Sequence, residues 1–194
     1  MPSSRSPVAE LLADLRGAFG ALGARWYLFG AQAAIVHGAA RLTADVDVTV
    51  DLAARSSAEL VSALAAAGFE PRVPDPEGVV ETTRVLPLVH RPTRIPVDVV
   101  LAGPGLEDLF FARVEEHAIG GVPVPVASAE DVLTMKVLAA RPKDLDDAEA
   151  IIQARGPRLD VERIRGTLRL LEAALDRRDL VSELERLLGR TGRA

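Results

Sequence analysis

The sequence contains no cysteine, few aromatic residues and few histidines, and each shortage excludes a class of site or structure. Without cysteine among its 194 residues, the chain cannot form disulfides or thiolate zinc sites. The histidines His37, His90 and His117 are too few and too scattered to predict a histidine metal site. Because only 4% of the residues are aromatic, we expect a core built from alanine, valine, leucine and isoleucine.

Long apolar runs are also missing from the sequence. None approaches the roughly 20 residues that a membrane-spanning helix needs, and the N-terminus has no apolar signal-peptide core. We therefore expect a cytoplasmic protein without a membrane partner. The net charge of -5 argues against non-specific binding of nucleic acid over the whole surface, although a local basic patch could hold phosphates. The hydrophobic content of 48% is too high for a disordered chain.

The order of the predicted elements indicates an α+β protein with a helical C-terminal part. Apolar periodicity and turn residues predict helices at 7–22, 31–37, 56–67, 106–117, 128–140, 143–154, 160–175 and 180–188. Alternating or compact apolar runs predict strands at 26–29, 45–50, 82–88, 94–101 and 122–126. Residues 71–81 are rich in proline, glycine and acids and predict a loop, and Pro96 predicts an edge position or an irregular strand start. We divide the chain into an α+β domain, 1–127, and a helical region, 128–194, packed on it.

Two aspartates one residue apart, Asp45 and Asp47, are the most informative feature of the chain. Side chains of a strand alternate between its faces, so both carboxylates would share one face while Val46, Val48 and Val50 face the core. Neighbouring carboxylates repel each other unless water or a cation separates them, and a hard divalent ion is the usual functional solution. The alternative is the solvated face of a half-buried strand.

Two further features could join this pair in space. The Gly30-Ala31 step lies between a predicted strand and a predicted helix, where glycine permits close approach of a phosphate and the helix start offers N–H groups. The same step could be an ordinary strand-to-helix turn. Asp98 interrupts a strand of apolar residues, and a third carboxylate would complete a two-cation site. It could instead be a surface residue paired with Arg94.

In this order, Gly30-Ala31, Asp45-Val46-Asp47 and Asp98 resemble the DNA polymerase β-like nucleotidyltransferase superfamily. That superfamily has a Gly-Ser or Gly-Gly turn, an Asp-x-Asp or Asp-x-Glu pair and a third acid. More narrowly, the chain resembles the AbiEii/AbiGii-type nucleotidyltransferase toxins and their relatives over about residues 25–155. The segments that carry this resemblance are Phe29-Gly-Ala-Gln-Ala-Ala34, Arg41-Leu-Thr-Ala-Asp45-Val-Asp47 and Arg141-Pro-Lys-Asp144-Leu-Asp-Asp147-Ala.

The resemblance implies a fold, a reaction and a set of site residues. The fold would be a nucleotidyltransferase-like mixed sheet flanked by helices. Asp45, Asp47 and Asp98 would hold two Mg²⁺ ions and catalyse transfer of a nucleoside monophosphate from an NTP, such as ATP, to an acceptor hydroxyl of tRNA or protein. The chain would then be the toxin of a toxin–antitoxin or abortive-infection system, with a cognate antitoxin. The residues implied to bind the nucleotide are Gly30, Ala31, Arg41, Thr43, Lys136, Lys143 and Asp144.

Several of these residues also have simpler explanations. Lys136 could be a solvated lysine at the edge of an apolar stripe. Asp144 lies in a first helical turn, where an acid favours the helix dipole without any function. Arg41 could pair with a nearby acid instead of contacting a nucleotide or an acceptor.

Ala31 departs from the superfamily pattern and keeps other functions open. Serine or glycine usually stands at this position, and a serine hydroxyl would help to hold the triphosphate, whereas alanine leaves only backbone N–H groups. One alternative is therefore a catalytically degenerate protein of the same fold that binds a nucleotide or a partner. A second is a haloacid-dehalogenase-type phosphatase, because Asp45-Val-Asp47-Val-Thr49 fits its Asp-x-Asp-x-Thr motif. That motif normally follows a hydrophobic strand, and Arg41–Ala44 does not resemble one.

Overall fold

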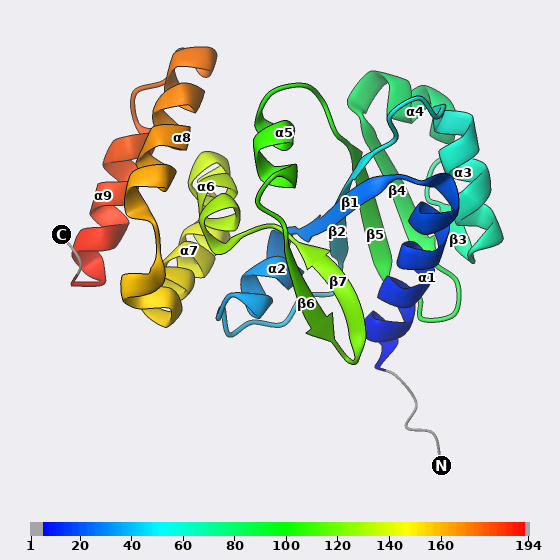
Figure 1. The fold of residues 1–194 in the computed structure, drawn as a ribbon, viewed down its shortest axis with the longest axis horizontal. Helices are drawn as coiled ribbons and strands as arrows, with labels where there is room; N and C mark the ends of the chain where they lie inside the picture. The colour runs from blue at the N-terminus through cyan, green and yellow to red at the C-terminus, as the bar shows by residue number, and fades with distance from the viewer. Residues whose placement is uncertain (1–5, 193–194) are drawn as a thin grey trace. The chain divides into compact units, whose positions relative to one another are not determined.

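A computed structural model describes residues 6–192 (Figure 1). Its internal contacts divide the chain into two compact units. The first unit contains the residues up to Gln32 together with Thr43–Ala127. The second contains Ala33–Leu42 and the residues from Ser128 onward. The contacts of the short segment Ala33–Leu42 thus place it in the same unit as the helical C-terminal part. The sequence-based division assigned this segment to the first domain.

Every strand of the described chain lies in the first unit, within one seven-stranded mixed sheet of order β3-β4-β5-β2-β1-β7-β6. Two neighbouring pairs are parallel, β1 with β7 and β2 with β5, and the other pairs are antiparallel. The predicted α+β class is therefore confirmed. The strands are β1 (Arg25–Phe29), β2 (Val46–Asp51), β3 (Phe69–Pro71), β4 (Val85–His90), β5 (Pro96–Leu101), β6 (Glu115–Ile119) and β7 (Val122–Val126).

The alternation of side chains along β1 shows which helices cover which face of the sheet. Trp26 contacts Phe19 of α1, with ring centroids 5.3 Å apart, whereas Tyr27 contacts Phe110 and Phe111 of α5 at 6.5 and 4.9 Å. Because successive side chains point to opposite faces, α1 and α5 lie on opposite sides. Helices α3 and α4 continue the layer formed by α1 (Figure 1). The helices of this unit are α1 (Pro7–Leu22), α3 (Ser57–Ala66), α4 (Pro76–Thr83) and α5 (Leu106–Phe111).

The face beneath α1 holds the apolar core of the first unit. Val46, Val48 and Val50 of β2 are fully buried there, as the alternation of the sequence predicts. Helix α1, which covers this face, begins after a capping serine and ends at the left-handed glycine Gly23. Ser6 caps α1 by accepting a hydrogen bond from the Ala9 N–H, at 3.3 Å. This packing leaves the opposite face, with its odd-numbered residues of β2, to the polar side chains described below.

The second unit consists of helices that bury leucine, isoleucine and valine against one another. The segment Ala33–Leu42 is bound to α7: a Cβ on Gly38 would lie 2.3 Å from the Ala154 Cβ, and Arg155 hydrogen-bonds to His37. Helix α2 (Gly30–Val36) begins in the first unit and ends in this segment. The remaining elements are α6 (Ala129–Ala139), α7 (Pro142–Arg155), the 3₁₀ turn η1 (Gly156–Arg158), α8 (Val161–Leu175) and α9 (Leu180–Arg190).

Several predicted elements need correction. Helix α4 begins inside the predicted loop 71–81, where Asp75 caps the helix and Pro76 occupies its first turn. It extends to Thr83, so the strand predicted at 82–88 begins only at Val85. Strand β6 occupies part of the predicted helix 106–117, which ends at Phe111. Strand β5 lies between β4 and β2, so Pro96 begins a central strand and not an edge strand. Across residues 6–192, no helix combines the length and apolar character that crossing a bilayer requires.

Candidate functional site

Asp47 and Asp98 come from neighbouring parallel strands and lie on the same face of the sheet. Asp47 of β2 is in register with Asp98 of β5, and Phe29 of β1 and Pro87 of β4 continue this row. Side chains at paired positions of adjacent strands lie about 5 Å apart. The fold therefore brings together two carboxylates that are distant in the sequence. Asp47 is half-buried, and the Asp98 side chain is 40% exposed, so both belong to an accessible surface.

Gly30 contacts the carboxylate of Asp47 at the start of α2. Its φ of +66° is the left-handed conformation that glycine adopts without strain. A Cβ at this position would lie 2.1 Å from Asp47 Oδ2 and 2.9 Å from the Asp47 Cβ, closer than van der Waals contact allows. Glycine is thus required both by the backbone and by the neighbouring acid. The next residue, Ala31, is 7% exposed and forms part of the core.

Asp45 lies just before β2 and not within it, which corrects the predicted strand 45–50. It is exposed, whereas Asp47 is half-buried, so strand alternation does not by itself align the two side chains. The Thr43 hydroxyl donates a hydrogen bond to Asp45 Oδ1. The predicted residues Thr43, Asp45 and Asp47 therefore follow one another at the entry to β2, with the threonine restraining the first carboxylate.

Asp98 has a cationic partner that the sequence does not reveal. Arg72, directly after β3, forms an ion pair with Asp98 Oδ1, and the suggested pairing with Arg94 is not observed. Arg72 also donates from Nε to the Leu88 carbonyl at 3.0 Å, and its backbone N–H donates to the Pro87 carbonyl at 2.9 Å. No local pattern could have identified this residue, because it reaches Asp98 across the intervening strand β4.

The chemistry of Asp45, Asp47 and Asp98 fits a hard divalent cation such as Mg²⁺, which prefers carboxylate oxygens. Among the described residues, however, no group of three or more His, Cys, Asp or Glu side chains has a geometry that could hold a metal ion. In this arrangement Asp98 binds Arg72, and Asp45 binds Thr43. The donors fit the ion, and closing around it would require at least one of these side chains to rotate.

The second unit contains a buried cluster of charges centred on Lys136. Its ammonium group lies 3.0 Å from Asp144 Oδ1 and 2.7 Å from Asp147 Oδ2. Arg41 donates to Asp147 at 2.9 Å, and Arg141 forms an ion pair with Asp144. Lys136 is only 6% exposed, so the alternative of a solvated lysine is wrong. The alternative that Arg41 pairs with a nearby acid is confirmed, which leaves its contact with a nucleotide a prediction.

The electrostatics of this cluster favour an anionic ligand. Three cationic side chains surround two carboxylates, so the cluster carries a positive charge in excess. Burial would raise the pKa of Asp144, but its hydrogen bonds from Arg141 and Lys136 outweigh that effect and hold the pKa below its usual value. Asp144 is therefore ionised at neutral pH, and it acts on its surroundings as a fixed negative charge.

A hollow of about 360 Å³ lies beside this cluster, lined by Ala39 to Arg41 and by residues of α7. Lys143 and Asp146 contribute exposed side chains to its wall, and Asp147 contributes a buried one. The hollow thus contains two of the residues predicted to bind nucleotide, Arg41 and Lys143. Lys136 and Asp144 belong to the cluster and not to the wall.

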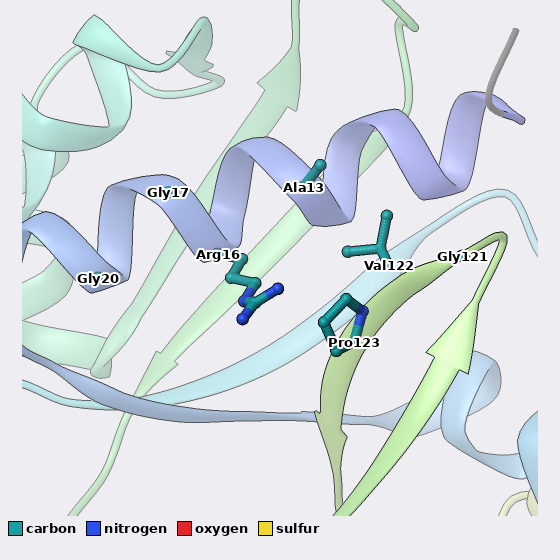
Figure 2. A pocket seen from close by; sticks show the side chains of 7 residues that line it. All are labelled: Ala13, Arg16, Gly17, Gly20, Gly121, Val122 and Pro123. Atoms are coloured by element: carbon teal, nitrogen blue, oxygen red, sulfur yellow. The ribbon is translucent and has the colours of Figure 1, made fainter. Parts of the chain in front are cut away.

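A separate hollow of about 390 Å³ lies in the first unit between α1 and the turn from β6 to β7. Figure 2 shows the side chain of Arg16 extending from α1 toward Pro123. The other lining residues are small or apolar, with Gly17 and Gly20 on the helix. Because the described residues that line it include no carboxylate and none of the predicted site residues, this hollow is not the candidate site.

The sequence matches a known family over most of its length. The family model described as "Nucleotidyl transferase AbiEii toxin, Type IV TA system" matches residues 13–191. None of the curated proteins matches the chain.

Solved structures share the fold at low sequence identity. The solution structure of the antibiotic-resistance factor ANT(2'')-Ia is 16% identical with a TM-score of 0.59, covering 89% of this chain and 97% of that chain. An antigenic nucleotidyltransferase-like protein from Paracoccidioides brasiliensis is 20% identical with a TM-score of 0.58, covering 93% and 94%. The lincomycin-bound lincosamide antibiotic adenylyltransferase LnuA is 15% identical with a TM-score of 0.52, covering 76% and 98%. These similarities establish a common fold.

Proposed function

Since the chain belongs to the AbiEii family of nucleotidyl transferase toxins, we propose that it transfers a nucleoside monophosphate from an NTP to an acceptor hydroxyl. The observation that carries this proposal is the in-register pairing of Asp47 with Asp98 beside Gly30. Carboxylates side by side on one face repel each other, and a glycine is required where the chain passes Asp47. A cation-binding phosphoryl-transfer site explains both features together.

We assign Mg²⁺ to Asp45, Asp47 and Asp98, with two ions as the expected number. Bound there, Mg²⁺ would polarise the α-phosphoryl group and lower the pKa of the acceptor hydroxyl. The chain itself contributes orientation. Thr43 restrains Asp45, and the absence of a side chain on Gly30 lets the Asp47 carboxylate lie against the start of α2. The first N–H groups of α2, which have no partner within the helix, are donors for that phosphate.

In the second unit, we propose that Arg41 and Lys143, at the hollow beside α7, are nucleotide-binding residues. Both line this hollow, and the neighbouring cluster has a positive charge in excess. Lys136 and Asp144 then act from behind the wall, since both are buried. Lys136 supplies the positive charge, and Asp144 fixes the position of its ammonium group.

The family description names a toxin of a type IV toxin–antitoxin system. We propose that this chain is such a toxin and that a cognate antitoxin counteracts it. A tRNA 3′ end or a protein hydroxyl is the acceptor that we favour. The reaction needs NTPs, so the cytoplasm is the compartment in which we expect it to occur.

The proposal is tested by incubating the full chain with each α-³²P-labelled NTP, Mg²⁺ and bulk tRNA or total protein. We expect label on one acceptor class and release of pyrophosphate. Asp47→Asn and Asp98→Asn should each abolish labelling while leaving the circular dichroism spectrum unchanged. Asp51→Asn is the matched control, because Asp51 lies on the same face of β2 and pairs with Arg25. Labelling that persists in Asp47→Asn would refute the assignment.

The same experiment separates the alternatives. A haloacid-dehalogenase-type phosphatase would release phosphate from phosphomonoesters without pyrophosphate from NTPs. The structure disfavours it, because Asp45 precedes β2, whereas that motif follows a strand. A catalytically degenerate protein would bind NTPs in calorimetry without labelling any acceptor, and Ala31 is the residue that supports this second candidate.

A further inference from the structure

Arg72 forms an ion pair with Asp98, a member of the proposed carboxylate set. Its guanidinium is held by two acceptors, the Asp98 carboxylate and the Leu88 carbonyl at 3.0 Å. Its backbone N–H donates to the Pro87 carbonyl at 2.9 Å. Its side chain therefore crosses β4, the strand that separates β3 from β5. An arginine restrained in this way is an organised part of the site.

The position of Arg72 addresses an electrostatic problem that the register of the sheet creates. Asp47 and Asp98 lie about 5 Å apart on one face, and two carboxylates at that spacing destabilise the fold when both are ionised. A guanidinium bound to Asp98 offsets this repulsion. Pro87 pairs with Asp98 across the sheet, and the Arg72 backbone N–H donates to the Pro87 carbonyl. The proline ring carries no charge, so it does not compete with Arg72 for the Asp98 carboxylate.

We propose that Arg72 is a positioning residue that serves as an exchangeable counter-ion: it neutralises Asp98 when no divalent cation is bound, and it must release Asp98 when a cation binds. This inference rests on the proposed function, because it concerns the same carboxylates. The two positive partners compete for one carboxylate. Their competition sets the affinity for the cation below the value that the acids alone would give.

The exposure of the pair suits it for exchange. The side chains of Arg72 and Asp98 are 41% and 40% exposed, and an exposed ion pair is weak enough to open at small free-energy cost. After release, the Arg72 side chain remains tethered near Asp98 by its backbone bond to Pro87. A buried pair of the kind formed by Lys136 and Asp144 could not exchange so readily.

The test measures binding of Mn²⁺, as a paramagnetic substitute for Mg²⁺, to the full chain by electron paramagnetic resonance without any nucleotide. Arg72→Gln should bind Mn²⁺ roughly two- to fivefold more tightly than the wild type, the range that corresponds to an exposed ion pair. The same variant should melt at a lower temperature without Mn²⁺ and recover when Mn²⁺ is added. Arg72→Lys, which keeps the charge, should bind Mn²⁺ with nearly wild-type affinity.

Arg91→Gln is the matched control, because Arg91 forms a comparably exposed pair with Glu70, at 3.8 Å, away from the carboxylates. Its Mn²⁺ affinity should equal that of the wild type. A purely structural role for Arg72 would lower the melting temperature of Arg72→Gln without tightening Mn²⁺ binding, and that result would overturn the inference alone. Wild-type binding that is unaffected by Asp47→Asn and Asp98→Asn, or no binding by any variant, would overturn the metal assignment and the inference together.

Discussion

Replacing Lys136 by methionine removes the ammonium group at the centre of the second unit's charge cluster with little change in side-chain volume. The ammonium lies 3.0 Å from Asp144 and 2.7 Å from Asp147 and is almost fully buried. Both acids remain buried in the variant, so they lose a charged hydrogen-bond donor that water cannot easily replace. We therefore expect a large loss of stability and not the small effect of a surface lysine.

The magnitude follows from the partners that remain. Removing one member of a buried ion pair destabilises a protein by about 3–5 kcal/mol. Here Asp147 retains Arg41 and Asp144 retains Arg141, so we expect about 3 kcal/mol, the lower end of that range. For a chain of this length, such a change lowers the melting temperature by roughly 6–12 °C.

The assay is thermal unfolding at pH 7, followed by circular dichroism. Hydrogen exchange in α6 and α7 is the second readout, because a chain of two units need not unfold in one step. Lys143→Met is the matched control, since Lys143 is an exposed lysine on the following helix, and its change should stay within about 0.5 kcal/mol. In Lys136→Met, adding Asp147→Asn should restore part of the loss. Equal melting temperatures for the two single variants would refute a buried, paired Lys136.

Three further predictions concern single residues. Gly30→Ala should reduce both stability and Mn²⁺ affinity, because the new Cβ would collide with Asp47 and an alanine in the left-handed conformation costs about 1 kcal/mol. Thermal unfolding and titration with Mn²⁺ followed by electron paramagnetic resonance measure the two effects. Unchanged Mn²⁺ binding would contradict the prediction. Asp144 has a lowered pKa, so its stabilisation is present above its ordinary value of 3.8 and is lost as the pH falls through the folded-state pKa. Melting temperatures between pH 3 and 7 should therefore fall more steeply for the wild type than for Asp144→Asn. His90→Phe removes two part-buried hydrogen bonds of the imidazole, to Asp14 at 3.0 Å and to Thr93 at 2.8 Å, and should cost about 1–2 kcal/mol in urea unfolding. A wild-type midpoint would show that these bonds contribute nothing.

Local sequence patterns predicted the parts of the fold that depend on local interactions. The helix at Pro7–Leu22 has a serine cap before it and a left-handed glycine, Gly23, after it. The helix after Ser56 has a capping box with Glu59. The alternation of valines in β2 correctly identified the buried face. In each case, the residues that determine the element lie within it or next to it.

The elements that were missed have signals that compete with each other. In α4, Asp75 and Pro76 mark a helix start, but the surrounding prolines, glycine and acids resemble a loop. Strand β6 is an edge strand with mostly exposed residues, so it lacks the apolar alternation by which strands are recognised. Pairing with β7 determines its conformation, and pairing between strands is not visible in one segment of sequence.

The candidate site shows the same distinction between local and distant contacts. The order of Gly30, the aspartate pair and Asp98 could be read from the sequence because a family pattern preserves that order. Arg72 could not, since its contact with Asp98 depends on the register of β3, β4 and β5. The hydrogen bond from Arg41 to Asp147 joins residues that are far apart in the chain. The apolar periodicity of the sequence predicts the helix that contains Asp147, but it does not predict this bond.

The segment from Arg41 to Asp47 explains why so short a motif carries so much of the site. Arg41 belongs by its contacts to the second unit, and Thr43 to the first. Arg41 binds Asp147, Thr43 restrains Asp45, and Asp47 pairs in register with Asp98. Successive odd-numbered residues thus make contacts in one unit and then in the other, joined by a few peptide bonds. The segment is thus the stretch of chain in which the contacts change from those of the second unit to those of the first.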